Sequence, residues 1–366
     1  MEQLDYIPIL KFKSAEIEAL GLLDDEDKSK ILPLLEAVPV FEVPKKYKDT
    51  YGSNVQKYLT EIKAKEDAGK ILSSYGDYCC FAIDCGLISS RVMREGYLKA
   101  FLDFSKELFL KPFISVNLND MDLLSCLDKW AKNGGLKRVI IRLTEYDLTR
   151  KSEVLESIRE IRKDIDALAI VVDLRENCKS DVYEKSISFI RWLNDEVGGV
   201  DFWAISSGAF PKDMSMFRID DPYEKQRIER VDFLNWKKNN VESKDEPKII
   251  FSDYTIRHPI YDPMIERHQS SCTIKYTKEK YWQILRGSAN KRIHYVYNAY
   301  LLASNSDFSG ENHCAGDAYI QEKANLFAAQ REEVKKTGNP TSWLRAGITH
   351  HIKTTIGQID RIYGSQ

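Results

Sequence analysis

The sequence predicts an α/β fold: an irregular (β/α)8 barrel of the TIM type over residues 1–260, followed by a C-terminal α+β extension over residues 261–366. Three observations support this. Short apolar runs alternate with longer amphipathic stretches, which is typical of parallel βαβ units. Eight such runs fall within about 250 residues, as a TIM barrel requires. The pattern then changes after Tyr254.

The expected barrel strands are eight short apolar segments bounded by polar or turn-forming residues. They are Ile7–Lys13, Ile31–Val38, Tyr78–Cys85, Phe113–Asn119, Arg138–Thr144, Ala169–Arg175, Phe202–Ser207 and Lys248–Tyr254. The second unit is irregular, because residues 39–76 hold two Tyr-Gly dipeptides and an uncertain helix. An open doubly wound sheet is the alternative fold, but it usually contains fewer strands.

Helices are expected between most of these strands. Val154, Ile158, Ile161 and Ile165 recur at steps of three and four, so they share one helical face. Gly134-Gly135 follows another helical pattern, as does Gly198-Gly199, and glycine past a helix end accepts the left-handed conformation.

The extension carries a different succession of elements. We expect strands at Thr273–Thr277 and Tyr281–Leu285, helices over 290–304 and 320–336, and a polar loop over 305–317. This region is either a second small domain or an elaboration that covers one end of the barrel.

Composition narrows the function classes. The 366 residues include 54 Lys and Arg against 56 Asp and Glu. With charges this balanced, no strong long-range attraction to nucleic acid or to an acidic membrane is expected. A local basic patch is still compatible with this balance. The chain has no apolar run of about 18 residues and no signal-peptide pattern at its start. Seven cysteines without a CxxC pair fit a reducing compartment, so we expect a cytoplasmic protein.

Polar side chains recur two residues apart near the ends of the expected strands. Asn117 and Asn119 share one face of their strand, Asp173 and Arg175 share another, and Lys11 and Lys13 do the same. The outer face meets helices and has no room for bare charge, so these side chains are expected to point into the barrel. In this fold the active site lies at that end of the strands.

These residues form the predicted site. The candidate catalytic residues are Asp84, Asp173 and Asp253, and the candidate ligand-binding residues are Lys11, Lys13, Glu36, Asn117, Asn119, Arg142 and Arg175. The Lys and Arg side chains can hold a phosphate or carboxylate, while the acids can act as a base or bind Mg²⁺. Alternatively, the balanced charges pair with one another as a buried ion network without a catalytic task.

Two C-terminal features are weaker candidates. His313, Cys314 and Asp317 lie close in sequence, with His350-His351 further on, which allows a Cys nucleophile with a His base, a metal site, or a lid without chemistry. The stretch from Cys272 to Tyr300 interleaves basic and aromatic residues, which can bind single-stranded nucleic acid or form an amphipathic surface.

Segments at both ends of the chain carry a family resemblance. They are Tyr6–Lys13 with Glu16, Ala19 and Leu20, Pro33–Glu36, Gly316-Asp317, and the tail with Trp343, Gly347 and His350-His351. In these segments the sequence resembles the beta protein family, which is spread through bacterial and phage genomes. Its members are similar to proteins on mobile elements, often beside genes linked to phage defence. The resemblance implies that Lys11, Lys13 and Glu36 are worth testing.

Two functional hypotheses follow. In the first, a cytoplasmic barrel protein of phage–host conflict recognises a phosphate-bearing ligand, such as a nucleotide or nucleic-acid end, and hydrolyses it in a metal-assisted phosphodiesterase-type reaction. In the second, the barrel is a non-catalytic scaffold, and the extension docks a partner protein or single-stranded nucleic acid. Neither hypothesis involves a membrane.

Overall fold

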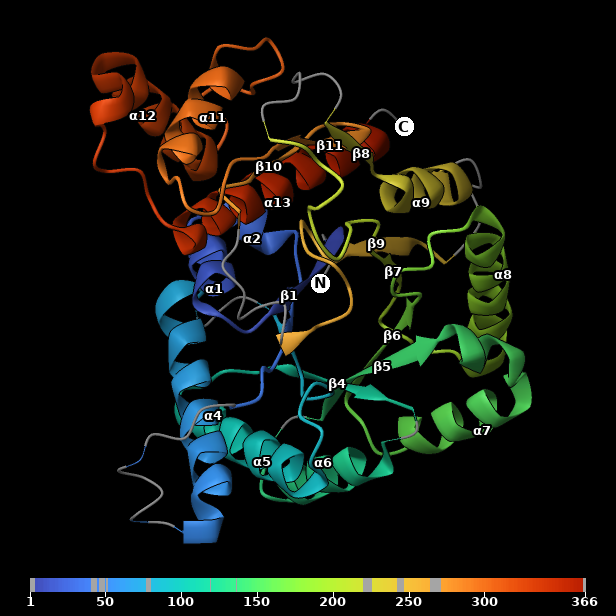
Figure 1. Ribbon diagram of the computed structural model, residues 1–366. Helices are drawn as coiled ribbons and strands as arrows, with labels where there is room; N and C mark the ends of the chain where they lie inside the picture. The colour runs from blue at the N-terminus through green and yellow to red at the C-terminus, as the bar shows by residue number, and fades with distance from the viewer. Residues whose placement is uncertain are drawn as a thin grey trace.

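Eight parallel strands close into a barrel in the computed structural model. The structure describes residues 4–40, 45, 50, 52–76, 80–118, 120–135, 137–219, 226–241, 247–263 and 271–364. The strand order around the barrel is β1-β2-β3-β4-β5-β6-β7-β9. Helices surround the strands, and the extension lies over one side (Figure 1). The predicted (β/α)8 fold is therefore confirmed.

Each barrel strand overlaps one of the predicted apolar runs. The strands are β1 (Tyr6–Lys11), β2 (Leu34–Glu36), β3 (Ala82–Asp84), β4 (Phe113–Asn117), β5 (Arg138–Thr144), β6 (Ala167–Asp173), β7 (Phe202–Ser207) and β9 (Ile249–Asp253). The bounds of β5 and β7 are those predicted. The other six strands all end one or two residues earlier than expected, so Lys13 and Arg175 lie in the loops that follow their strands.

The helices of the barrel cover its outer face. They are α1 (Ser14–Gly21), α2 (Asp25–Ser29), α4 (Val55–Ser74), α5 (Arg91–Glu107), α6 (Met121–Lys132), α7 (Lys151–Arg162), α8 (Ser180–Val197) and α9 (Val231–Val241), with 3₁₀ turns at Gly52–Asn54 and Glu145–Thr149. Val154, Ile158 and Ile161 are buried on α7, as their spacing predicted. Gly134 and Gly198 have φ of 83° and 63°, the left-handed conformation expected after a helix.

Side-chain alternation separates an outer core from an inner one. The side chains that meet inside the barrel form their own apolar cluster: Ile7, Ile9, Leu32, Leu34, Ala82, Phe113, Ile140, Ala169, Val171, Phe202, Ala204, Ile250 and Tyr254. Going along β1 by steps of two, Ile7 and Ile9 lead to Lys11. The same step leads from Ile140 to Arg142 on β5. The inner face is thus apolar along most of the strands and becomes charged at their carboxyl ends.

The extension contains a three-stranded antiparallel sheet and three long helices. Its elements are β10 (Ile274–Thr277), β11 (Tyr281–Leu285), α11 (Ile293–Ala303), α12 (Ala315–Gln330), a 3₁₀ turn (Arg331–Glu333) and α13 (Pro340–Gly364). The third strand of this sheet is β8 (Arg227–Glu229), which lies between β7 and β9 in sequence and pairs with β11. Helix α12 begins within the segment that the sequence predicted to be a loop, with Cys314 as its N-cap.

Helix α13 joins the extension to the barrel. It crosses over α1 and β1 in Figure 1, and its Ile352, Ile356 and Ile359 are at most 1% exposed. Burying each such side chain contributes about 1.5–3 kcal/mol. Two glycines permit close packing here. A Cβ on Gly347 would lie 2.7 Å from Ile256 Cδ1, and one on Gly316 would lie 2.3 Å from the carbonyl oxygen of Ala346.

Candidate functional site

Seven side chains meet at the carboxyl ends of the barrel strands and form what we call the ion cluster. They are Lys11, Glu36, Asp84, Arg142, Asp173, Arg175 and Tyr254. Register explains why they meet, because Lys11 pairs with Glu36 and Glu36 pairs with Asp84 on adjacent strands. Six of the seven are predicted site residues. Tyr254 was not among them.

Arg142 is at the centre of the ion cluster and contacts all three acids. Its Nη1 donates to Glu36 Oε1 at 3.0 Å and to Asp84 Oδ2 at 2.8 Å. Its Nη2 donates to Asp173 Oδ2 at 2.5 Å and to the Tyr254 hydroxyl at 2.9 Å. The side chain is 6% exposed, so these are contacts within the protein interior.

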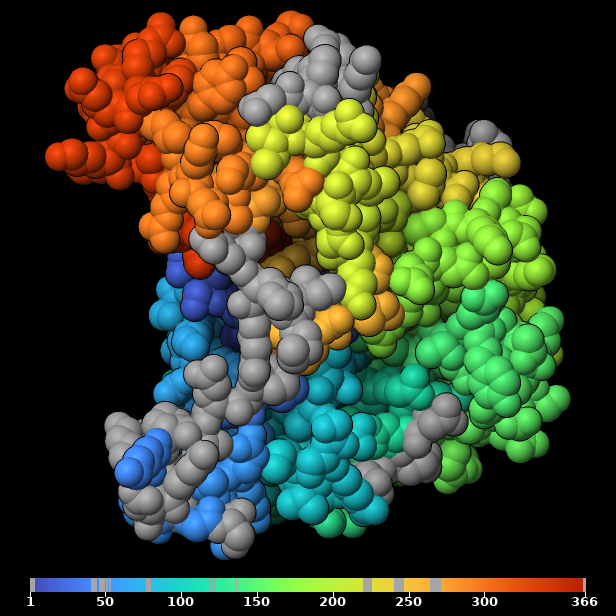
Figure 2. All heavy atoms as spheres, in the orientation of Figure 1, coloured from blue at the N-terminus to red at the C-terminus, as the bar shows by residue number. Residues whose placement is uncertain are grey.

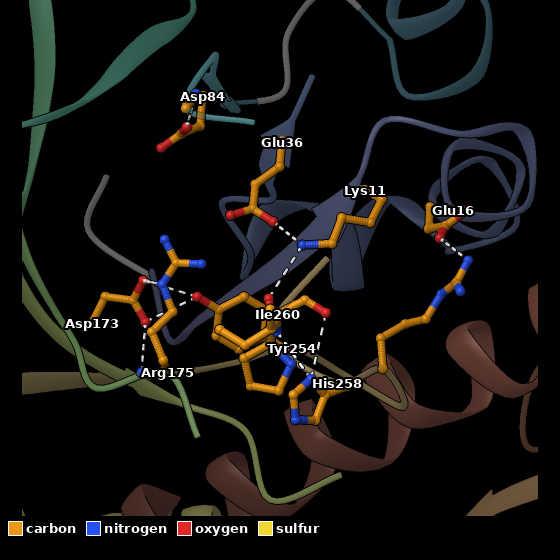
Figure 3. A network of polar contacts seen from close by, with 12 residues as sticks. Lys11, Glu16, Glu36, Asp84, Asp173, Arg175, Tyr254, His258 and Ile260 are labelled. Atoms are coloured by element: carbon orange, nitrogen blue, oxygen red, sulfur yellow. Dashed lines mark hydrogen bonds and ion pairs between the residues drawn. The ribbon is translucent and has the colours of Figure 1, made fainter. Parts of the chain in front are cut away.

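The remaining members complete the pairing around Arg142. Lys11 forms an ion pair with Glu36, and Arg175 Nε lies 3.0 Å from Asp173 Oδ2. The Tyr254 hydroxyl lies 2.9 and 2.8 Å from the two oxygens of Asp173. Figure 3 shows Lys11 pointing at Glu36, and Tyr254 and Arg175 converging on Asp173. Three cations therefore face three carboxylates.

The pKa shifts of Glu36 and Arg142 favour the charged forms of these two side chains. Burial acts to raise the pKa of Glu36, but the positive charges of Lys11, Arg142 and Arg175 outweigh it and lower that pKa to about 2. Burial likewise opposes the charge on Arg142, yet Asp173 and its other anionic neighbours raise the pKa of Arg142 above its ordinary value. The charges of Glu36 and Arg142 are therefore stabilised by the opposite charges around them.

Local chain geometry gives the aspartates at the strand ends a structural role. Asp84 Oδ1 accepts the backbone N–H of Gly86 at 2.7 Å, and Asp173 Oδ1 accepts that of Arg175 at 3.1 Å. Aspartate commonly bonds the backbone two residues on and so closes a turn. Arg175 has φ of 54°, so this turn holds a non-glycine residue in the left-handed region.

This arrangement restricts the chemistry of the three acids. Arg142 contacts every one of them, so none is positioned as a general base or a Mg²⁺ ligand. Among the described residues, the group of His, Cys, Asp and Glu side chains spaced to share a metal ion is His313, Asp317 and His350, in the extension. The ion cluster is arranged as the buried network that the sequence offered as an alternative.

The other four predicted site residues do not join the ion cluster. Lys13 begins α1 as its N-cap, and its Nζ lies 5.0 Å from the ring centre of Tyr261. Asn117 ends β4 with an exposed side chain, beside Arg142 in register. Asn119 lies outside the described residues. The prediction that Asp253 points into the barrel with the others is wrong.

Asp253 faces outward, toward α13. The residues before and after it in the sequence, Ser252 and Tyr254, lie on the inner face of the barrel. Because side chains alternate along a strand, Asp253 lies on the outer face. Asp253 Oδ2 lies 2.9 Å from His351 Nε2, and Tyr6 donates to Asp253 Oδ1 at 2.5 Å. All three residues are fully buried. Asp253 therefore connects the barrel to the extension and is closed off from any ligand.

A large cavity, which we call the basic cavity, opens beside the ion cluster. Its volume is about 1090 Å³, and it lies between the ends of β1, β7 and β9 and the extension. Figure 2 shows a hollow between the blue N-terminal segments and the orange extension. Among the described residues that line it, eight are Lys or Arg and three are acidic. These are Lys11, Lys13, Lys63, Lys70, Lys212, Arg257, Lys275 and Arg286 against Glu16, Asp213 and Asp262.

The cations of the basic cavity are only partly neutralised by its acids. Arg257 pairs with Glu16 at 2.9 Å, and Lys212 pairs with Asp262 at 3.0 Å. Other wall lysines pair with acids that lie outside the wall, Lys11 with Glu36 and Lys63 with Asp67. Arg286 instead donates to the backbone carbonyl of Phe217, which carries no charge. The excess of positive charge in a concave site attracts anions. Sequence reasoning missed this cavity because its walls come from many separate segments, and only Lys11 and Lys13 among the predicted residues line it.

The structure tests the two C-terminal candidates, the segment around Cys314 and the basic stretch from Cys272 to Tyr300, in different ways. Cys314 Sγ lies 3.0 Å from Asp317 Oδ2, and burial followed by the charge of Asp317 raises the pKa of its thiol, which opposes a thiolate nucleophile. Tyr297 of the basic stretch is 40% exposed, but Tyr276, Trp282 and Tyr295 are at most 2% exposed and belong to the core. They are therefore not a surface on which bases can stack.

Comparison with known protein families gives a match over most of this chain. No helix within the described part of the chain is both long and apolar enough to cross a membrane. No curated protein matches the sequence. The family model described as Beta protein matches residues 6–357, nearly the whole chain, and includes both the ion cluster and the extension. The chain therefore belongs to the Beta protein family.

Proposed function

We propose that this protein binds a phosphate-bearing ligand, such as a nucleotide or the end of a nucleic acid, in the basic cavity at the carboxyl end of the barrel. The observation that carries the proposal is the charge of the cavity wall, with eight basic side chains against three acids among its described residues. Lys and Arg are the side chains that hold phosphate oxygens, and TIM barrels commonly bind phosphates at this end.

The size and lining of the basic cavity favour a ligand larger than inorganic phosphate. Its volume of about 1090 Å³ slightly exceeds the range for small-molecule sites, about 300–1,000 Å³. Phe12 and Tyr261 lie on the wall with Lys13, so an apolar or aromatic part of the ligand can pack beside its phosphate. A nucleotide combines those two parts.

Binding has better support than hydrolysis. Asp84 and Asp173, the candidate catalytic residues, contact Arg142 at 2.8 and 2.5 Å, and each also closes a turn. A hydrolase using Mg²⁺ needs carboxylates that are not already held by arginine. In this proposal the ion cluster shapes the floor of the site, and Lys11 belongs to both the cluster and the cavity wall.

The proposal includes a cytoplasmic setting in phage–host conflict. Its support is the family resemblance, since members of the family are similar to proteins found on mobile elements, often beside genes linked to phage defence. The alternative, a scaffold that docks partners through the extension, has less support because three of the six aromatic side chains it would use, Tyr276, Trp282 and Tyr295, are buried.

The proposal can be tested by fluorescence anisotropy with a labelled oligonucleotide carrying a 5′-phosphate, competed with ATP and with inorganic phosphate. We expect the phosphorylated oligonucleotide to bind more tightly than its unphosphorylated twin. The double variant Lys13→Ala/Lys212→Ala removes two cavity cations and should weaken binding about tenfold.

The matched control is Lys163→Ala/Lys185→Ala, which removes the same charge at positions 66% and 72% exposed and away from the cavity wall. Its affinity should stay within about twofold of the original, a difference of about 0.4 kcal/mol. Failure of every phosphorylated probe to bind at physiological salt would overturn the proposal. Equal losses in the two double variants would do so as well, since only the total charge would then matter.

A further inference from the structure

A second polar site lies in the extension, where α12 begins beside α13. His313, Asp317 and His350 each present a ligand atom there, and these atoms lie within 4.8 Å of one another. Cys314 adds a fourth group, because its Sγ lies 3.0 Å from Asp317 Oδ2. Asp317 and His350 are fully buried, while His313 and Cys314 are partly exposed.

The hydrogen bonds of His350 call for a cation at this place. Its Nε2 lies 2.8 Å from the carbonyl oxygen of Thr277, which only accepts, so Nε2 carries a hydrogen. A neutral ring then has a lone pair on Nδ1. That nitrogen faces Asp317 Oδ2 at 2.7 Å, so two electron-rich atoms meet in the protein interior. A positive ion between them, either a proton or a metal ion, removes this conflict.

The surroundings of Asp317 favour a metal ion over a proton alone. Tyr276 donates its hydroxyl to Asp317 Oδ1 at 2.7 Å, which leaves Oδ2 facing His350 and Cys314. The Tyr276 ring also stacks on the His350 ring with their centres 3.8 Å apart. Metal-binding histidines usually donate their second N–H to a carbonyl or carboxylate, and metal-binding carboxylates are held by further hydrogen bonds. Both features are present here.

The donor set indicates which metal. Two imidazoles, one carboxylate and one thiol are the groups that bind Zn²⁺ in tetrahedral sites, at about 2.0–2.3 Å. Hard cations such as Mg²⁺ prefer oxygen ligands throughout. Donors around a tetrahedral zinc lie about 3.3–3.7 Å apart. Small outward shifts of Cys314 and His350 from Asp317 would reach that spacing.

We propose that His313, Cys314, Asp317 and His350 bind one Zn²⁺ ion, which fixes the start of α12 to α13. The ion replaces both the thiol proton of Cys314 and the proton held between His350 and Asp317, and both protons go to solvent when zinc binds. The partly exposed His313 and Cys314 lie on the side from which the ion enters. Because α13 also carries Trp343 and Leu344 of the basic-cavity wall, the site holds one wall of that cavity in place.

Metal content of the full chain tests this proposal. The purified protein is stripped with a chelator, dialysed against Zn²⁺ or Co²⁺, and measured by mass spectrometry of the metal and by the visible spectrum of the Co²⁺ form. We expect one ion per chain, with intense tetrahedral bands and a thiolate-to-cobalt charge-transfer band. His313→Ala should weaken zinc binding at least tenfold, and Cys314→Ser should remove the charge-transfer band.

The matched controls are His294→Ala and Cys126→Ser, which change partly buried residues of the same types outside the site. Neither should alter the metal content or the Co²⁺ spectrum. The proposal fails if the original chain retains no more zinc than the double variant His313→Ala/Cys314→Ser, or if Cys126→Ser removes the charge-transfer band.

A second measurement does not depend on the folding of any variant. Zinc should protect Cys314 of the original chain from alkylation, as located by mass spectrometry of peptides, and should leave the labelling of Cys126 unchanged. Equal labelling of Cys314 with and without zinc would also overturn the proposal.

Discussion

The ion cluster and the basic cavity lie beside each other at the carboxyl end of the barrel, and Lys11 belongs to both. In the ion cluster, three cations face three carboxylates, and Arg142 alone contacts all of the acids. In the basic cavity, cations outnumber acids among the described residues of the wall. The comparison teaches that charged residues at a barrel mouth indicate a ligand site only where their charges remain unbalanced.

The largest effect should come from removing the centre of the ion cluster. Arg142→Ala leaves three buried carboxylates without their shared partner, and breaking such a buried pair costs about 3–5 kcal/mol. The free energy of unfolding, measured in urea, should fall by that amount. Lys13→Ala, on the cavity wall, should change it by no more than about 0.5 kcal/mol. Similar values for the two variants would remove the distinction between the two regions.

Acid should destabilise the ion cluster through Glu36. The folded protein lowers the pKa of this residue from 4.5 to about 2, so its stabilising effect is complete above pH 4.5 and is lost as the pH falls toward 2. The difference corresponds to about 3 kcal/mol. Urea unfolding at several pH values should show a smaller loss between pH 4.5 and 2 in Glu36→Gln than in the original chain.

Glu160→Gln is the control for this measurement, because Glu160 is 70% exposed. Its pH dependence should match that of the original chain. If Glu36→Gln also follows the original curve, the charge of Glu36 does not contribute to stability.

A smaller effect is expected from the hydroxyl of Tyr254. Tyr254→Phe removes the hydrogen bonds to Asp173 and to Arg142, and a hydrogen bond to a charged group contributes about 1.5–3 kcal/mol. The urea midpoint should fall accordingly, while Tyr297→Phe, at a position 40% exposed, should leave it unchanged. Equal midpoints in these two variants would show that Tyr254 only fills space.

Much of the fold followed from periodicity in the sequence. The apolar runs predicted the eight barrel strands because both faces of each strand are buried over most of its length. Strand β8 was missed, since its three residues Arg227–Glu229 are not an apolar run and are stabilised by pairing with β11. The start of α12 was missed because its first turn contains glycine and aspartate, which also suit a loop.

The candidate site was predicted less completely than the fold. Alternation along the strands placed Lys11, Arg142 and Asp173 on the inner face, and the structure brings them into one cluster. Asp253 was assigned by its position at a strand end without applying alternation, which turns it to the outer face. The partner His351 lies 98 residues away, and no local pattern reveals such a contact. The basic cavity escaped prediction for the same reason.

Strand β8 has a consequence for any attempt to divide this protein. The segment that leaves the barrel after β7 supplies an edge to the sheet of the extension and then returns as α9 and β9. Arg230, which follows β8 and is fully buried, donates to Thr355 and Gln358 of α13. Truncation near residue 260 would strip these partners away, so the two halves should melt together and neither should be transferable alone.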